Sequence, residues 1–189
     1  MNLRALSLAA IAMWVPASPG FGQKTFTANL VGVHETPIVV STGTGHATVT
    51  ISNDEKSIAY ELTFSGLEGN MVPAGKVLFA HIHIGRPTVV GGVAVFFCGG
   101  GNTTATQAAC PTSGTVSGTW TPVDVVGPTA QGVDPANQGA DDAFARLVKS
   151  IKSGLSYANV HTTRSAGGEI RGQLVPARDH DHDGDTDDK

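Results

Sequence analysis

Two histidines lie at alternate positions of an apolar segment. Their type and spacing most directly suggest a functional site. They are His81 and His83, in the run FAHIHIG that ends at Gly85. If this run is a β-strand, alternation places both imidazoles on one face and apolar residues such as Ile82 on the other. The strand then anchors in the core while the two imidazoles look outward or into a cleft.

A second segment, Tyr157–Thr162, carries a third histidine in the same setting. Its sequence YANVHT places Tyr157, Asn159 and His161 on one strand face. A His-x-His pair joined by a distant histidine is a ligand set that copper and zinc sites on β scaffolds use, because rigid strands hold the nitrogens at fixed separations.

Two interpretations of the three histidines remain open. In the first, His81, His83 and His161 bind a copper or zinc ion. In the second, they form a structural cluster without an ion and orient neighbouring strands through hydrogen bonds. The polar residues expected to take part in such a cluster are Asn159, Thr162 and Glu169.

An acid and a base share a face of the last apolar segment. Glu169 and Arg171 flank Ile170, and strand alternation turns both charged side chains to the same side. This spacing predicts a structural ion pair; alternatively, the planar Arg171 guanidinium grips the carboxylate or phosphate of a ligand. Glu35, near the end of the first predicted strand, is a further expected partner for Arg171 or for a histidine.

Other chemistries find little support in the sequence. It holds no Gly-x-Ser-x-Gly motif and no phosphate-binding glycine loop ahead of a helix. We therefore expect no catalytic residues. The run from Asp179 to Asp185 opens like a calcium loop, but its twelfth position would fall after Lys189. The segment 179–189 is instead predicted to be an acidic, disordered tail.

Charge is distributed unevenly along the chain. The tail holds six Asp and one Lys, whereas residues 23–178 hold ten acidic and ten basic residues and are neutral. A neutral body offers no basic face for nucleic acid, so nucleic-acid binding is not expected.

The first 22 residues resemble a secretory signal peptide. Arg4 supplies a positive start, and the apolar stretch after it is about eleven residues long, too short to span a membrane. The mature domain is therefore expected at residues 23–178, without a transmembrane span. In an oxidising compartment, Cys98 and Cys110 are expected to form a disulfide. These features predict a secreted protein, extracellular or periplasmic.

The elements that must position these residues are mostly strands. The chain has 24 Gly, 10 Pro and only 15% charged residues, which favours many turns and a β-rich fold. Apolar alternation bounded by Gly, Pro, Asn or Asp predicts eight strands. They are Lys24–Val33, Gly45–Ile51, Ser57–Phe64, Val77–Ile84, Gly91–Phe97, Gly114–Trp120, Ser156–Thr162 and Gly168–Val175.

One helix interrupts this pattern. Phe144, Leu147, Val148 and Ile151 recur at helical spacing before Gly154. The preceding segment, Pro122–Gln138, lacks periodicity and is expected to be a long surface loop. The predicted fold is mainly β: an antiparallel, Greek-key-like β-sandwich or barrel of about eight strands with one crossover helix.

Four motifs follow one another along the chain: GVHETP at Gly32–Pro37, AHIHIG at Ala80–Gly85, NVHT at Asn159–Thr162 and GEIRGQL at Gly168–Leu174. Their order resembles the CHRD domain, named after chordin. The resemblance spans roughly Thr25 to Val175. The cysteine loop and the Pro122–Gln138 insertion depart from it.

The resemblance implies a non-catalytic extracellular or periplasmic binding module whose partner is a protein or an envelope component. In chordin, the domain accompanies other modules in a secreted growth-factor antagonist. The alternative is a copper- or zinc-binding or redox protein that uses the three histidines. A looser similarity to copper/zinc superoxide dismutase lies in the His-x-His strand, but no histidine is suited to bridge two metals, so dismutase activity is not expected.

Overall fold

The strands of the chain form one antiparallel sheet, seen in a computed structural model that describes residues 24–67, 76–100 and 108–177. Their order across the sheet is β5-β4-β7-β8-β1-β2-β3-β6, and a short β9 pairs with β1. The strands are β1 (Lys24–Val31), β2 (Thr44–Ile51), β3 (Ile58–Ser65), β4 (Val77–Ile84), β5 (Gly92–Gly99), β6 (Gly114–Trp120), β7 (Ser156–Thr162), β8 (Ile170–Gln173) and β9 (Val175–Pro176).

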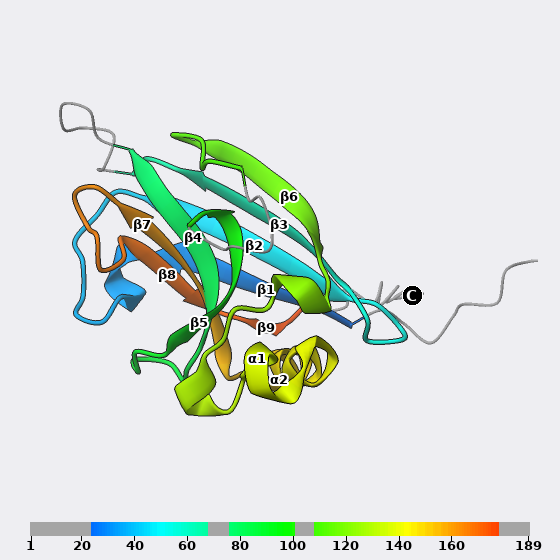
Figure 1. Cartoon of the computed structure of the whole chain (residues 1–189). Coiled ribbons are helices and arrows are strands. Elements are labelled where there is room, and N and C mark those ends of the chain that lie inside the picture. The colour runs from blue at the N-terminus through cyan, green and yellow to red at the C-terminus, as the bar shows by residue number, and fades with distance from the viewer. Residues whose placement is uncertain (1–23, 68–75, 101–107, 178–189) are drawn as a thin grey trace, which may run out of the picture.

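The sheet curls until its end strands, β5 and β6, contact each other (Figure 1). Trp120 of β6 donates its indole N–H to the Phe96 carbonyl of β5 at 2.7 Å. The Trp120 ring also stacks on Tyr60 of β3 and packs against Phe97 of β5. These contacts join the two edges, between which the described residues form no backbone ladder. The prediction of a mainly β, antiparallel barrel is thereby confirmed.

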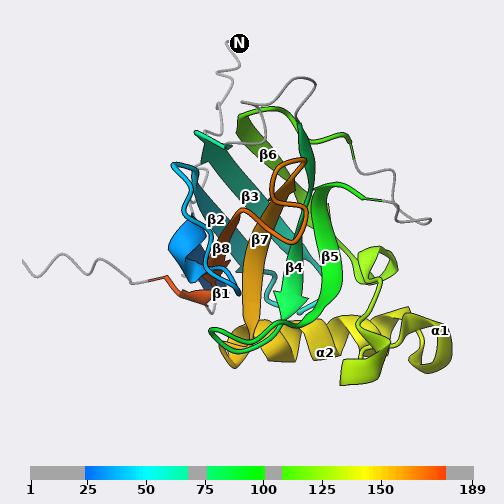
Figure 2. The same cartoon turned by 90° about the vertical axis from the view of Figure 1, so that its left-hand side faces the viewer.

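Strand alternation directs one face of each strand into the barrel. Leu30, Val49, Leu62, Ile82 and Val160, from five different strands, are all fully buried there. Helix α2 (Ala140–Lys152) lies across one end of the barrel (Figure 2). Its buried face is the predicted one, formed by Phe144, Leu147, Val148 and Ile151. The predicted crossover helix between β6 and β7 is therefore confirmed.

The segment Pro122–Gln138 differs from the surface loop that the sequence predicts. It contains two short 3-10 helices, η3 (Pro122–Asp124) and η4 (Thr129–Gln131), and the one-turn helix α1 (Pro135–Gln138). Val125 and Val133 are buried in the core. Single turns of helix are too short to produce a 3.6-residue apolar period. The spacing of apolar residues therefore does not predict them.

Two predicted strands end earlier than expected. The first stops at Val31, after which Gly32–His34 forms the 3-10 turn η1. The Gly32 carbonyl accepts the backbone N–H groups of both Glu35 and Val39, and these bonds close a loop in place of the strand ladder. The last predicted strand is divided at Leu174 into β8 and β9.

The predicted disulfide is confirmed: Cys98, at the end of β5, is bonded to Cys110. No helix within the described ranges has the length and apolar character of a membrane span. The predicted signal peptide at 1–22 and the acidic tail at 179–189 lie outside the described residues.

Candidate metal site on the outer face of the sheet

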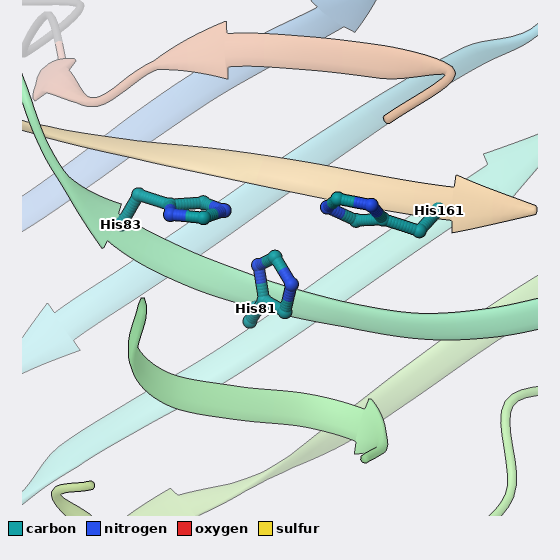
Figure 3. Close-up of side chains that lie close together, drawn as sticks. All are labelled: His81, His83 and His161. Carbon is teal, nitrogen blue, oxygen red and sulfur yellow. The ribbon is translucent and has the colours of Figure 1, made fainter. Parts of the chain in front are cut away.

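The strands that carry the three histidines are neighbours in the sheet. β4 and β7 pair antiparallel, with His81 opposite Asn159 and His83 opposite Tyr157. The alternate residues of β4, Ala80 and Ile82, belong to the barrel core. The three histidines therefore lie on the outer face, as alternation predicts, and Figure 3 shows them directed toward a common centre.

The three rings are packed against one another. Ring centroids are 4.3 Å apart for His81 and His83, 4.5 Å for His81 and His161, and 6.3 Å for His83 and His161. One ring nitrogen from each histidine lies within 4.8 Å of the other two. A trigonal ion with bonds of about 2.1 Å requires nitrogens about 3.6 Å apart. Nitrogens at the upper limit of 4.8 Å would therefore have to move closer together to bind one ion.

Backbone carbonyls fix the tautomers of two of the histidines. Nδ1 of His83 lies 2.8 Å from the Gly91 carbonyl, and Nδ1 of His161 lies 2.9 Å from the Ala166 carbonyl. A carbonyl only accepts, so each neutral ring carries its proton on Nδ1 and keeps the Nε2 lone pair free. Histidines that ligate metals are held by such a hydrogen bond from the other ring nitrogen.

Two nitrogens of the cluster are buried without a hydrogen-bond partner among the described residues. They are Nδ1 of His81 and Nε2 of His161. Leaving such a buried polar atom unsatisfied costs about 1–3 kcal/mol. An ion between the rings would supply the missing interaction.

Burial keeps the three histidines neutral. Desolvation, with smaller contributions from His83 and His161, lowers the pKa of His81 well below its ordinary value of 6.5. Burial lowers the pKa of His83 to about 4 and also lowers that of His161. All three rings are therefore unprotonated at neutral pH, the form that metal ligation requires.

Aromatic rings enclose the cluster. Phe79 packs against His81 and His161, Phe96 meets His81 edge-on, and Tyr157 stacks on His83 at 4.7 Å. The grouped ligands include no carboxylate within the described part of the chain. The site is thus a neutral, three-imidazole set in apolar surroundings.

Asn159 and Glu169 hydrogen-bond to groups other than the histidines. Asn159 donates its amide to Glu35 at 2.5 Å. Glu169 accepts hydrogen bonds from Thr162 at 2.5 Å and from Ser41 at 2.7 Å. These bonds tie the loop after η1 to β7, beside the histidines. The predicted hydrogen bonds from Asn159, Thr162 and Glu169 to the histidines are not among the described contacts.

Arg171 contacts loop carbonyls and an aromatic ring, and its predicted ion pair with Glu169 stays a prediction. Arg171 is 3% exposed and donates Nη2 to the carbonyls of Arg86 and Val89, at 2.9 and 3.0 Å. Its guanidinium also lies 3.4 Å from the centre of the Tyr157 ring. Loop carbonyls and an aromatic face thus surround the guanidinium. Glu35 interacts with Arg171 electrostatically, which partly offsets the effect of burial on the pKa of Glu35.

Sequence reasoning missed the groups that hold the cluster from the loops. These groups are the backbone carbonyls of Gly91 and Ala166. Every residue type has a backbone carbonyl, so no side-chain pattern marks them. Tyr157 was placed on the correct face, and its role as a ring stacked on His83 is visible only in the structure.

An outward-facing buried histidine triad on an eight-strand antiparallel barrel defines the protein as a β-barrel domain with a candidate metal site. The CHRD domain family profile matches residues 26–174. The chain therefore belongs to the CHRD domain family. No curated protein and no solved structure matches it at a significant level.

Proposed function

We propose that this CHRD domain is an extracellular or periplasmic module that binds one copper or zinc ion through His81, His83 and His161. The observation that carries the proposal is the grouping of three neutral imidazoles with their ligand nitrogens within 4.8 Å. Neutral imidazole is a ligand that both ions accept.

The hydrogen bonds around the cluster favour an ion over a purely structural role. A structural cluster satisfies its ring nitrogens with protein partners. Here one nitrogen of His81 and one of His161 are buried without such a partner in the described structure. The side chains of Asn159 and Glu169, which would serve as partners, bond elsewhere.

Location outside the cytoplasm is the second part of the proposal. A disulfide between Cys98 and Cys110 is typical of oxidising compartments. The family assignment agrees with an extracellular binding module, and a protein or an envelope component is the proposed partner. The role is proposed to be non-catalytic, in line with the lack of a Gly-x-Ser-x-Gly motif in the sequence.

The test is the metal content and metal affinity of the protein made without an affinity tag or chelator. We expect about one equivalent of copper or zinc by elemental analysis, and saturable binding of Zn²⁺ or Cu²⁺ by the metal-free protein. The His81→Ala/His83→Ala variant should bind at least about 100-fold more weakly, since it loses two of three ligands.

The matched control is His46→Ala, because His46 is exposed and hydrogen-bonds to Asn29 away from the cluster. This variant should bind metal as the wild type does. Thermal unfolding in EDTA verifies that each variant is folded. Absence of saturable binding by folded wild-type protein at neutral pH would reject the metal site and leave the histidines a structural role.

A further inference from the structure

A cavity of about 550 Å³ lies outside the barrel beside β8, and none of the three clustered histidines lines it. Its wall comes from η1 and the residues after it, from the β4–β5 loop and from β8 and β9. Figure 2 shows η1 and the β4–β5 loop near β8. The volume lies within the range of small-molecule sites, about 300–1,000 Å³.

The rim of this cavity is apolar and open to solvent. Val33, Ile38 and Val175 line it and are 61%, 66% and 51% exposed. Pro37 and Pro87 add further apolar surface to the same wall. Large aliphatic side chains gathered around a concave site indicate a surface that an apolar ligand covers.

A buried cation lines the same cavity. Arg171 is 3% exposed, and both of its hydrogen bonds use the same nitrogen, Nη2. A guanidinium has five N–H donors on three nitrogens. Nε and Nη1 of Arg171 therefore have no hydrogen-bond acceptor within the described residues.

The charge of Arg171 is only partly balanced. Its two hydrogen bonds go to the uncharged backbone carbonyls of Arg86 and Val89. Glu35, which also lines the cavity, has its pKa raised by burial to about 7, so its carboxyl is partly protonated at neutral pH. A buried cation without a full counter-charge favours the entry of an anion.

We propose that the cavity binds a small amphipathic monocarboxylate, with the carboxylate on Arg171 and the alkyl chain along Val33, Ile38 and Val175. The planar guanidinium fork matches a carboxylate. A single cation beside a partly ionised acid suits a monoanion better than a phosphate dianion. The site shares no lining residue with the histidine cluster, so the inference stands apart from metal binding.

The test is calorimetric titration of the whole protein with octanoate at neutral pH. EDTA keeps the protein free of metal, so that an ion at the histidine cluster cannot affect the result. Octanoate should bind saturably, and octan-1-ol, which lacks the charge, should bind at least about tenfold more weakly. Equal affinities would overturn the assigned role of Arg171. No saturable binding of octanoate would overturn the site.

Substitutions on the exposed rim test the alkyl wall without disturbing the core. Ile38→Asp should weaken octanoate binding at least about tenfold, because it places a negative charge beside the alkyl chain of an anionic ligand. Val40→Asp is the matched control: Val40 is 89% exposed and does not line the cavity, so its affinity should equal that of the wild type. If the Ile38→Asp protein is folded and binds octanoate with wild-type affinity, the alkyl chain does not lie along this wall.

Binding of N-acetyl-leucine tests whether the ligand is a free carboxylic acid or the carboxyl end of a peptide. It presents the same head group on a short branched side chain. We expect it to bind more weakly than octanoate, because it covers less of the apolar wall. Tighter binding of N-acetyl-leucine would assign the cavity to a peptide terminus and overturn the proposal.

Discussion

Desolvation is the main cause of the lowered pKa of each histidine in the cluster. Each ring of the cluster is buried against aromatic neighbours, and its charged form is disfavoured because water is excluded. The same burial that prepares the rings for an ion makes the ion-free protein sensitive to acid. At the residue scale, proton binding and metal binding therefore compete for the same nitrogens.

The metal-free protein should lose stability as the pH falls from 6.5 towards 4. In this window, unfolded histidines take up protons, whereas the lowered pKa values of His81, His83 and His161 oppose their protonation in the fold, so the unfolded state binds more protons. Each such proton lowers the free energy of unfolding by about 1.4 kcal/mol per pH unit at most. Urea unfolding in EDTA across this pH range measures the effect.

Glu35 acts in the opposite direction and provides the matched variant. Its pKa is raised to about 7, so between its ordinary value of 4.5 and 7 the folded state binds the extra proton. This contribution decreases stability as the pH rises. Glu35→Gln removes it, and the variant should show a steeper loss of stability on acidification than the wild type. A flat profile in both proteins would contradict the lowered histidine pKa values.

The face of each histidine could be predicted from sequence, whereas its partners could not. Alternation in β4 and β7 correctly placed His81, His83 and His161 on one side of the sheet. Alternation also assigns Arg171 to a strand face, but its acceptors are carbonyls of the loop at residues 86–89. Such acceptors depend on loop conformation, which side-chain patterns do not determine.

At the scale of elements, long strands were predictable and short turns were not. The bounds of β4, β6 and β7 agree with those read from apolar alternation. The segment Pro122–Gln138 has no such pattern, yet it contributes Val125 and Val133 to the core. Contacts with distant parts of the chain hold the segment between its helical turns, for example the hydrogen bond from the Val126 N–H to the Ala94 carbonyl.

The disulfide fastens the end of edge strand β5 to the segment before β6. Cys98 and Cys110 close a loop with a sequence separation of 12, and a loop of this length stabilises the fold by about 3 kcal/mol at most. Adding a reductant should therefore lower the free energy of unfolding of the wild type by up to this amount, while the barrel remains folded. Urea unfolding with and without reductant measures the difference.

The Cys98→Ala/Cys110→Ala variant is the control for this measurement. The reductant should have no effect on it, since no bond remains to break. Labelling of the unreduced, denatured wild type should find no free thiol at either position. Equal stability of the wild type with and without reductant would show that the bond adds nothing to the fold.

On the scale of the whole molecule, the outer face of the sheet carries both candidate sites. The histidine cluster lies over β4 and β7, and the apolar cavity lies beside β8. Tyr157 contacts both, because its ring stacks on His83 and also packs against Arg171. The barrel interior, filled by aliphatic and aromatic residues, supports these sites and leaves binding to the outer face and its loops.

Export of the chain is the remaining prediction at this scale. The apolar stretch at Ala5–Val15 and the small residues after it favour cleavage that leaves a new terminus between Ser18 and Gln23. Strand β1 begins at Lys24, which pairs with Ile51 of β2. Cleavage at any of these positions therefore preserves the whole first strand and its ladder.

Intact-mass measurement of the exported protein should find a chain that starts within Ser18–Gln23. A chain expressed directly from Gln23, refolded with its disulfide formed, should have the same unfolding midpoint as the exported protein, because the β1–β2 ladder is identical in both. Exported protein that retains Met1 would contradict the signal-peptide assignment. A markedly lower midpoint for the Gln23 chain would instead show that residues before β1 contribute to the fold.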